Sequence, residues 1–308
     1  MIATIHSLLR SSVTRRTTQW GPVLLACALL LGVGPAPAIG QDGGGSASAE
    51  AKKQKLEQLK KTFKSGMKAA KANQYDQAYT QLEQALQLAE DTEQGGAARK
   101  ITGYLQKLPK KWGNAAVENK DFSGALTHFD KGVEHDPEDA YMYYGKGLAL
   151  VNLDSTETGL TTLQKAIEVG NETGNTRVTG LASKRIRAEF LAKASKALNA
   201  QNPSATQVET ALSALDEMTS YVDPNAQSLF YRARALFEQG NHEEAIAAAE
   251  KGLGMHQGSR SDAAKYHFIV AESEMQLGNK QTACATFQKA AFGDYKARSE
   301  HYLKNDCE

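Results

Sequence analysis

The side chains best suited to chemistry in this 308-residue chain are scattered histidines and a few charged pairs. His128 and His135 would share one helix face, but two nitrogen ligands without a third make a poor metal site. Gly95-Gly96 with Arg99-Lys100 lacks the strand and the Ser or Thr of a phosphate loop. The acid pair Glu243-Glu244 lies at an expected helix start, where it favours the helix dipole. The sequence contains neither G-x-S-x-G nor H-E-x-x-H, so it predicts no enzyme, no cofactor and no metal centre.

Residues 1–38 have the layout of a secretory signal peptide. Three arginines precede an apolar run from Val23 to Val33, and Ala36-Pro37-Ala38 follows. The run is about half as long as a segment that crosses a bilayer. We therefore expect cleavage after Ala38, with Gly40 as the alternative, and an exported chain that is periplasmic or secreted.

Two other interpretations of this segment stay open. Leu24-Leu25-Ala26-Cys27 resembles a bacterial lipoprotein box, which would attach the chain to a membrane through Cys27, although the apolar run continues beyond that residue. Thr14-Arg15-Arg16 resembles a twin-arginine signal without the apolar residues that follow that motif. Residues 39–52, rich in Gly, Ser and Ala, are expected to form a flexible linker, and no transmembrane segment is expected in the mature chain.

Small and large apolar residues recur about every 34 residues from residue 58 onward. The pattern is clearest from Gln106 to Asp139 and in the unit that begins directly afterwards at Ala140. Such a period is typical of stacked helix–turn–helix units, whose helices approach closely only where the contacting side chains are small. The residues that keep the period include Gly113, Phe122, Ala125, Phe129, Pro137, Gly147, Gly159, Leu163, Ala166, Ala245, Ala283, Phe287 and Ala290.

This spacing resembles the tetratricopeptide repeat (TPR) family, and with the signal peptide it resembles the family's exported bacterial members. The resemblance implies an all-α, right-handed superhelical solenoid of stacked antiparallel helix pairs with a C-terminal capping helix. About six units would cover residues 53–308, of which 171–223 would be a divergent unit with helices over about 176–198 and 206–221. An inserted helix is expected to end at Pro109. A generic helical bundle and a solenoid of another family are the alternatives.

The resemblance also implies a partner-binding concave face lined by the first helix of each unit. Aromatic and Arg residues are typical anchors of binding surfaces, although here the rings could instead fill grooves between repeats. Lys110 and Asn114 resemble half of the carboxylate clamp that some members use for peptide C-termini, but Gly145 stands where that clamp has Asn. The candidate binding residues are Lys110, Asn114, Tyr141, Tyr144, Leu148, Asn152, Phe230, Arg234, Phe237 and Phe268, with Glu238 and Glu272 beside them.

Two cysteines, Cys284 and Cys307, would remain after loss of the signal peptide, in a compartment that permits disulfides. Cys284 lies in the last repeat's second helix, expected over about residues 280–292. After a turn at Gly293, a capping helix over about residues 294–304 would return antiparallel and bring Cys307 beside Cys284. We therefore predict a disulfide, with Cα atoms within about 7 Å. Two free thiols, or pairing of Cys307 between chains, are the alternatives.

Charge does not indicate a nucleic-acid partner. The chain has 36 basic and 35 acidic residues, and its densest basic stretches, Lys52–Lys61 and Lys107–Lys111, are expected to be solvated helix faces. The sequence thus predicts a non-enzymatic exported scaffold that binds a protein or peptide, in cell-envelope assembly or maintenance. A binding protein for small molecules or glycans, which would use a groove lined by Tyr141, Tyr144 and Phe230, is the alternative.

Overall fold

The computed structural model describes residues 44–200 and 202–307. The expected signal peptide, its cleavage site and Cys27 lie outside the described residues. The contacts between residues divide the chain into two units after Glu50. The helical array lies in the second unit, Ala51–Glu308. The described residues form helices and no strand, which confirms the all-α class. The helices are α1 (Gly44–Lys71), α2 (Tyr75–Asp91), α3 (Gly95–Glu118), α4 (Phe122–His135), α5 (Ala140–Asn152), α6 (Thr156–Glu172), α7 (Thr176–Ala197), α8 (Ala205–Thr219), α9 (Ala226–Gln239), α10 (His242–Met255), α11 (Arg260–Gln276), α12 (Lys280–Ala290), the 3-10 turn η1 (Gly293–Tyr295) and α13 (Lys296–Asn305).

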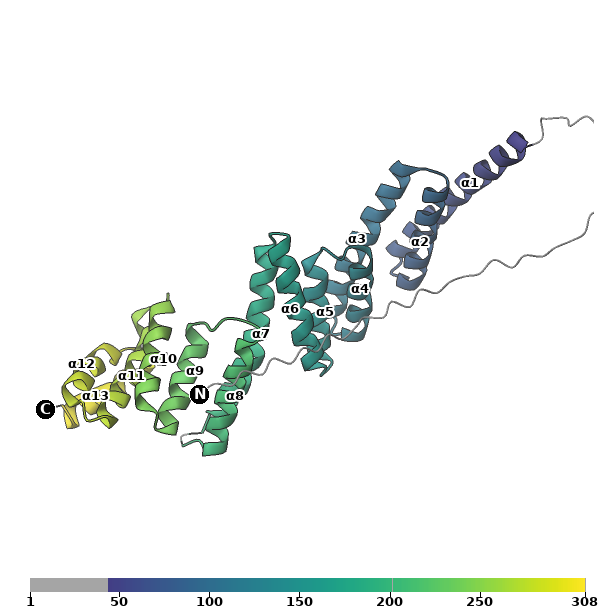
Figure 1. Ribbon diagram of the computed structural model, residues 1–308. Coiled ribbons are helices and arrows are strands. Elements are labelled where there is room, and N and C mark those ends of the chain that lie inside the picture. The colour runs from purple at the N-terminus through teal and green to yellow at the C-terminus, as the bar shows by residue number, and fades with distance from the viewer. Residues whose placement is uncertain (1–43, 201, 308) are drawn as a thin grey trace, which may run out of the picture. The chain divides into compact units, whose positions relative to one another are not determined.

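The helices stack in chain order as pairs, and each pair packs on the next (Figure 1). Helix α3 packs on α4, α5 on α6, α7 on α8, α9 on α10 and α11 on α12. The first helices of neighbouring pairs also touch, from α3 with α5 through to α9 with α11. The expected solenoid of stacked helix pairs is therefore confirmed. Because partners are close in sequence, each unit is stabilised mainly by its immediate neighbours.

The small residues of the repeat lie where helices approach most closely. Phe129 is 1% exposed and lies between Gly113 of α3 and Gly145 of α5. A Cβ atom added at Gly113 would lie 2.7 Å from the Phe129 ring. One added at Gly145 would come closer still. Ala125 is fully buried in the same cluster. The periodic glycines and alanine thus make room for the bulky residue between them.

One turn position recurs with a left-handed backbone. Gly240 and Gly278, which follow α9 and α11, have φ values of +87° and +81°. Lys120 and Asp154 follow α3 and α5 and adopt φ values of 61° and 59°. Glycine reaches this region without steric cost, whereas a side chain makes it unfavourable. The repeated Gly-Asn pair therefore identifies a left-handed turn position. Other units place Lys or Asp at that position, where a positive φ is less favourable.

The divergent unit has the two helices that the sequence predicts, to within two residues. Helix α7 runs from Thr176 to Ala197 and α8 from Ala205 to Thr219. A capping box begins α8: the Gln207 backbone N–H donates to Ser204 Oγ (3.3 Å), and the Ser204 N–H donates to Gln207 Oε1 (2.8 Å).

Two expectations are corrected. Helix α3 does not end at Pro109 but continues to Glu118, because its buried residues Ile101, Leu105 and Trp112 follow one face and pack as one cluster. That burial outweighs the backbone hydrogen bond that Pro109 removes. Helix α1 begins at Gly44, inside the range 39–52 expected to be a flexible linker. Its Ala- and Lys-rich sequence favours helix over coil.

Candidate functional site

Four predicted site residues meet where α3 lies beside α5. The Lys110 ammonium lies 4.0 Å from the centre of the Tyr141 ring, within cation–π distance. The Tyr141 hydroxyl donates to Asn114 Oδ1 at 3.0 Å, and the Tyr144 ring lies 5.8 Å from that of Tyr141. Burial raises the pKa of Tyr144. Asn114, Tyr141 and Tyr144 are half-buried, and Lys110 is exposed at the edge of this cluster.

Leu148 and Asn152 do not extend this cluster. They lie further along α5, and the exposed Asn152 side chain donates to the Leu148 carbonyl at 2.8 Å. This hydrogen bond lies within one helix, so it satisfies the Asn152 amide locally. The structure thus brings together four of the six candidates on α3 and α5.

The other four candidates line a cavity of about 730 Å³ at the C-terminal end, which we call the C-terminal pocket. A volume of this size falls within the range of ligand sites. Phe230 and Phe268 are buried and form its floor, whereas Arg234 and Phe237 are half-buried. The remaining lining residues are Asn199, Ala200 and Asn202 after α7, Glu238 of α9, Ile269 and Glu272 of α11, and Tyr295, Arg298 and Tyr302 from η1 and α13.

The charged groups of the C-terminal pocket are only partly balanced. Glu272 accepts from the Arg298 guanidinium (3.3 Å) and from the Tyr302 hydroxyl (3.2 Å), yet burial still raises its pKa. Burial also raises the pKa of Glu238, against the opposing charges of Arg234 and Arg298. The Arg298 guanidinium lies 4.2 Å from the Phe268 ring centre. The pocket therefore combines aromatic surface with charges of both signs, a composition suited to a polypeptide.

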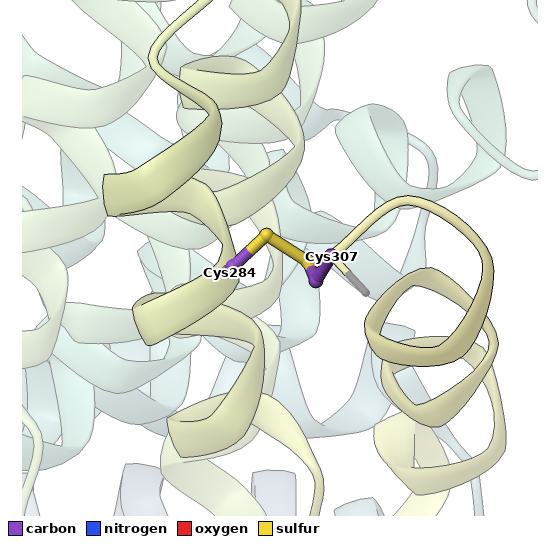
Figure 2. The surroundings of a disulfide bond; sticks show 2 residues. All are labelled: Cys284 and Cys307. Carbon is purple, nitrogen blue, oxygen red and sulfur yellow. A yellow bond between two sulfur atoms is a disulfide. The ribbon is translucent and has the colours of Figure 1, made fainter.

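The capping helix completes this pocket, and sequence reasoning missed its contribution. The capping helix was expected only to end the array, so none of Tyr295, Arg298 and Tyr302 is among the candidate binding residues. Tyr302 stacks on Phe287 of α12 at 4.4 Å between ring centres. Figure 2 shows Cys307, just after α13, joined to Cys284 on α12, and their Cα atoms are 5.7 Å apart. The bridge ties the element that carries Arg298 and Tyr302 to the last repeat.

The two histidines considered as metal ligands have different surroundings. His128 is buried among aromatic rings: the Tyr75 ring centre lies 4.5 Å away, and the Tyr79 hydroxyl lies 3.4 Å from His128 Nδ1. His135 Nε2 lies 3.2 Å from a Glu83 carboxylate oxygen. Within residues 44–200 and 202–307, no group of three or more His, Cys, Asp or Glu side chains could hold a metal ion.

Comparison with known families agrees with this architecture. The sequence profile of the tetratricopeptide repeat matches residues 110–171, 204–260 and 233–298, which together make up just over half of the chain. The chain belongs to the tetratricopeptide repeat family. TPR arrays are typically scaffolds for protein–protein interaction. None of the helices in the described part of this TPR chain is both long and apolar enough to span a bilayer.

Two curated relatives share part of this TPR sequence. The STIP1 homolog of Dictyostelium discoideum is 35% identical over 105 residues, which cover 33% of this chain and 19% of that protein. Stress-induced-phosphoprotein 1 of Caenorhabditis elegans is 28% identical over 202 residues, or 65% of this chain and 51% of that protein. The chain thus spans at most about half the length of either relative. Among solved structures, the 41-to-end fragment of MamA from Desulfovibrio magneticus RS-1 aligns with a TM-score of 0.36 and 19% identity, covering 63% of this chain and 96% of that one.

Proposed function

We propose that this TPR protein is an exported, non-enzymatic scaffold that binds a protein or peptide partner at the C-terminal pocket. The observation that carries the proposal is the composition of that pocket. Aromatic rings from α9, α11, η1 and α13 surround a cavity of about 730 Å³. Two arginines and two partly buried carboxylates share it. Aromatic and Arg side chains carry much of the binding energy at protein interfaces.

The residues of the pocket divide into a floor and a rim. Phe230 and Phe268 are fixed by packing, since they contact Tyr266 and Phe287 respectively. Arg234 and Phe237 lie one turn apart on α9 and are half-buried, so they can exchange solvent for a partner. Because packing already holds the floor residues in place, binding costs less side-chain entropy there, while the rim residues remain free to contact a partner.

Export and a role in cell-envelope assembly or maintenance are part of the same proposal. Residues 1–38 support export through their signal-peptide layout. The Cys284–Cys307 pair supports it independently, because disulfides persist in oxidising compartments. Membrane attachment would require lipidation at Cys27, and no nucleic-acid partner is proposed. Fusion of residues 1–52 to a reporter that is active only outside the cytoplasm tests export. An inactive fusion would contradict it.

The binding proposal is tested by capture of partners from envelope extracts on the purified protein, followed by affinity measurement. The test variant is Arg234→Ala with Phe237→Ala. Leu153→Ala is the matched control, since Leu153 is an exposed apolar residue away from the pocket. We expect a partner that binds the wild type and the control equally and the test variant at least about tenfold more weakly. Equal binding to all three proteins would move the site elsewhere, and the absence of any partner would contradict a scaffold.

The glycan-binding alternative has less support. The face of Tyr141 already carries the Lys110 ammonium, and Phe230 is 9% exposed, so neither ring offers an open stacking surface. These rings also lie in separate clusters on α5 and α9. A thermal-shift screen against glycans and small molecules decides between the two hypotheses. A glycan or small molecule that stabilises the wild type but does not stabilise Arg234→Ala would favour the alternative.

A further inference from the structure

Helix α7 in the divergent unit carries an unusual excess of positive charge. Its sequence holds six basic side chains against one acidic side chain, Glu189. Glu189 is already paired, since its carboxylate lies 2.5 Å from the Arg185 guanidinium one turn away. The other basic residues of α7 therefore have no acid on their own helix.

Two of these residues, Lys184 and Arg187, line a cavity of about 530 Å³ between α7 and the start of α9, which we call the α7–α9 pocket. Its walls include the apolar Ala188, Leu191 and Ala192. Ser195 of α7 and the residues Asn225, Gln227 and Tyr231 around the start of α9 supply hydroxyl and amide groups. The pocket shares no lining residue with the C-terminal pocket or with the Lys110–Tyr141 cluster.

Arg187 is held in this pocket by a hydrogen bond to a backbone carbonyl and not by a direct contact with a carboxylate. Its Nε donates to the Asp223 backbone carbonyl at 3.0 Å, which leaves the two terminal nitrogens for other acceptors. Among the described residues, no carboxylate lies within 4.0 Å of the Arg187 or Lys184 nitrogens. Burial lowers the pKa of Arg187, and the charge of Asp223 only partly opposes this effect. Burial of a guanidinium that is only partly balanced by a more distant carboxylate is costly, and an anion in direct contact would lower that cost.

The neighbouring polar groups are also arranged for an acceptor. The Tyr231 hydroxyl donates to Ser195 Oγ at 3.2 Å, so the Ser195 hydroxyl proton can be given to a third group. Lys184 is exposed at the mouth of the pocket, one turn before Arg187. A fixed guanidinium, a flexible ammonium and a hydroxyl donor would therefore meet any anion that entered.

We propose that the α7–α9 pocket is a carboxylate subsite that holds an acidic side chain of the polypeptide bound by this scaffold. The planar guanidinium can donate two parallel hydrogen bonds to the two oxygens of a carboxylate, whereas Lys184 adds a point charge. The small apolar walls accommodate the methylene groups of Asp or Glu. This inference rests on the proposed function, since it assigns a second anchor for the same partner.

The inference is tested with the full purified chain and a fluorescent hexaglutamate peptide that is acetylated and amidated at its ends. A matched hexaglutamine peptide controls for contacts that do not need charge. The test variant is Arg187→Gln. The control is Arg177→Gln, which removes the same charge from an exposed position on the same helix outside the pocket.

We expect the glutamate peptide to bind the wild type and the Arg177→Gln control with affinities within about twofold, and Arg187→Gln at least about tenfold more weakly. Equal losses in both variants would mean general attraction to a basic helix, and equal binding of both peptides would mean that charge is not recognised. Either result overturns the inference. Inorganic phosphate that displaces the peptide at equal concentration would indicate a site for small anions and would also overturn it.

Two further measurements keep the test decisive if Arg187→Gln unfolds. Arg187→Lys retains the charge but loses the planar fork, and it should also weaken binding of the glutamate peptide. Amide NMR signals of Ser195, Gln227 and Tyr231 should shift on titration, and unchanged signals would place the peptide elsewhere. A partner captured through the C-terminal pocket that shows no effect of Arg187→Gln would sink this inference and leave the proposed function standing.

Discussion

Loss of the Cys284–Cys307 bridge should loosen the cap of the array without unfolding the rest. The two cysteines are 23 residues apart in sequence, and the chain-entropy relation gives about 3 kcal/mol for closing a loop of that length. That value corresponds to a change of about 100-fold in the equilibrium for opening α13. Because repeats couple mainly to their neighbours, the effect should fade towards α9 and be absent in α3–α6.

A variant without the disulfide would keep the other contacts between the capping helix α13 and the last repeat. Tyr302 still stacks on Phe287, and Arg298 still reaches Glu272 at 3.3 Å, so α13 should remain docked most of the time. Cys307 is only half-buried, so serine at that position removes little packing. The double variant Cys284→Ser with Cys307→Ser should therefore report the lost covalent constraint.

Hydrogen exchange followed by mass spectrometry measures this effect locally. Amide protection in α12 and α13 should fall about 100-fold in the double variant and in the wild type treated with reductant, with no change in α3–α6. Reductant should not affect the double variant. Partner binding at the C-terminal pocket should weaken in parallel, since Arg298 and Tyr302 line it. Free thiols at both positions in the purified, oxidised protein, or unchanged protection of α13 after reduction, would refute the reasoning.

Three other perturbations follow from the fold. Gly145→Ala should lower the free energy of unfolding by about 1–3 kcal/mol because its new methyl group would overlap the Phe129 ring. Gly103→Ala, with open space around it, should raise that free energy by up to about 1 kcal/mol. Chemical denaturation compares the two variants. Lys120→Gly should stabilise by about 1 kcal/mol because the residue has a φ of 61°, and an unchanged melting temperature would argue against strain at that turn. Burial holds the pKa of His128 below its ordinary value of 6.5, so unfolding takes up a proton and stability should fall as pH drops below about 6.5. His128→Gln should make that fall shallower in calorimetry at pH 5–8, and an equal slope would contradict it.

Local pattern alone was enough to predict the architecture. The spacing of Gly113, Ala125 and Phe129 identifies a helix pair because only small residues allow such a close crossing, and the crossing then occurs where the pattern places it. The return of the chain at Gly293 and the approach of Cys307 to Cys284 also follow from helix lengths that the sequence indicates. The site residues on the first helices stay predictions, although four of them meet in the C-terminal pocket.

Tertiary structure decided which helices pack against one another to form the pockets. Periodicity tells which side of one helix is apolar, but it does not tell how that helix is rotated against elements of a different length or register. Pro109 lies inside a continuous α3 because burial on both sides of it outweighs one lost hydrogen bond. Arg298 and Tyr302 enter the C-terminal pocket from the cap, and Asn199 enters it from the turn after α7. Arg187 is contacted by the backbone carbonyl of Asp223, 36 residues further along the chain, and not by its carboxylate. These arrangements depend on side chains distant in sequence, so the sequence by itself determined the scaffold and its repeat register, whereas the packing between units decided where binding pockets form.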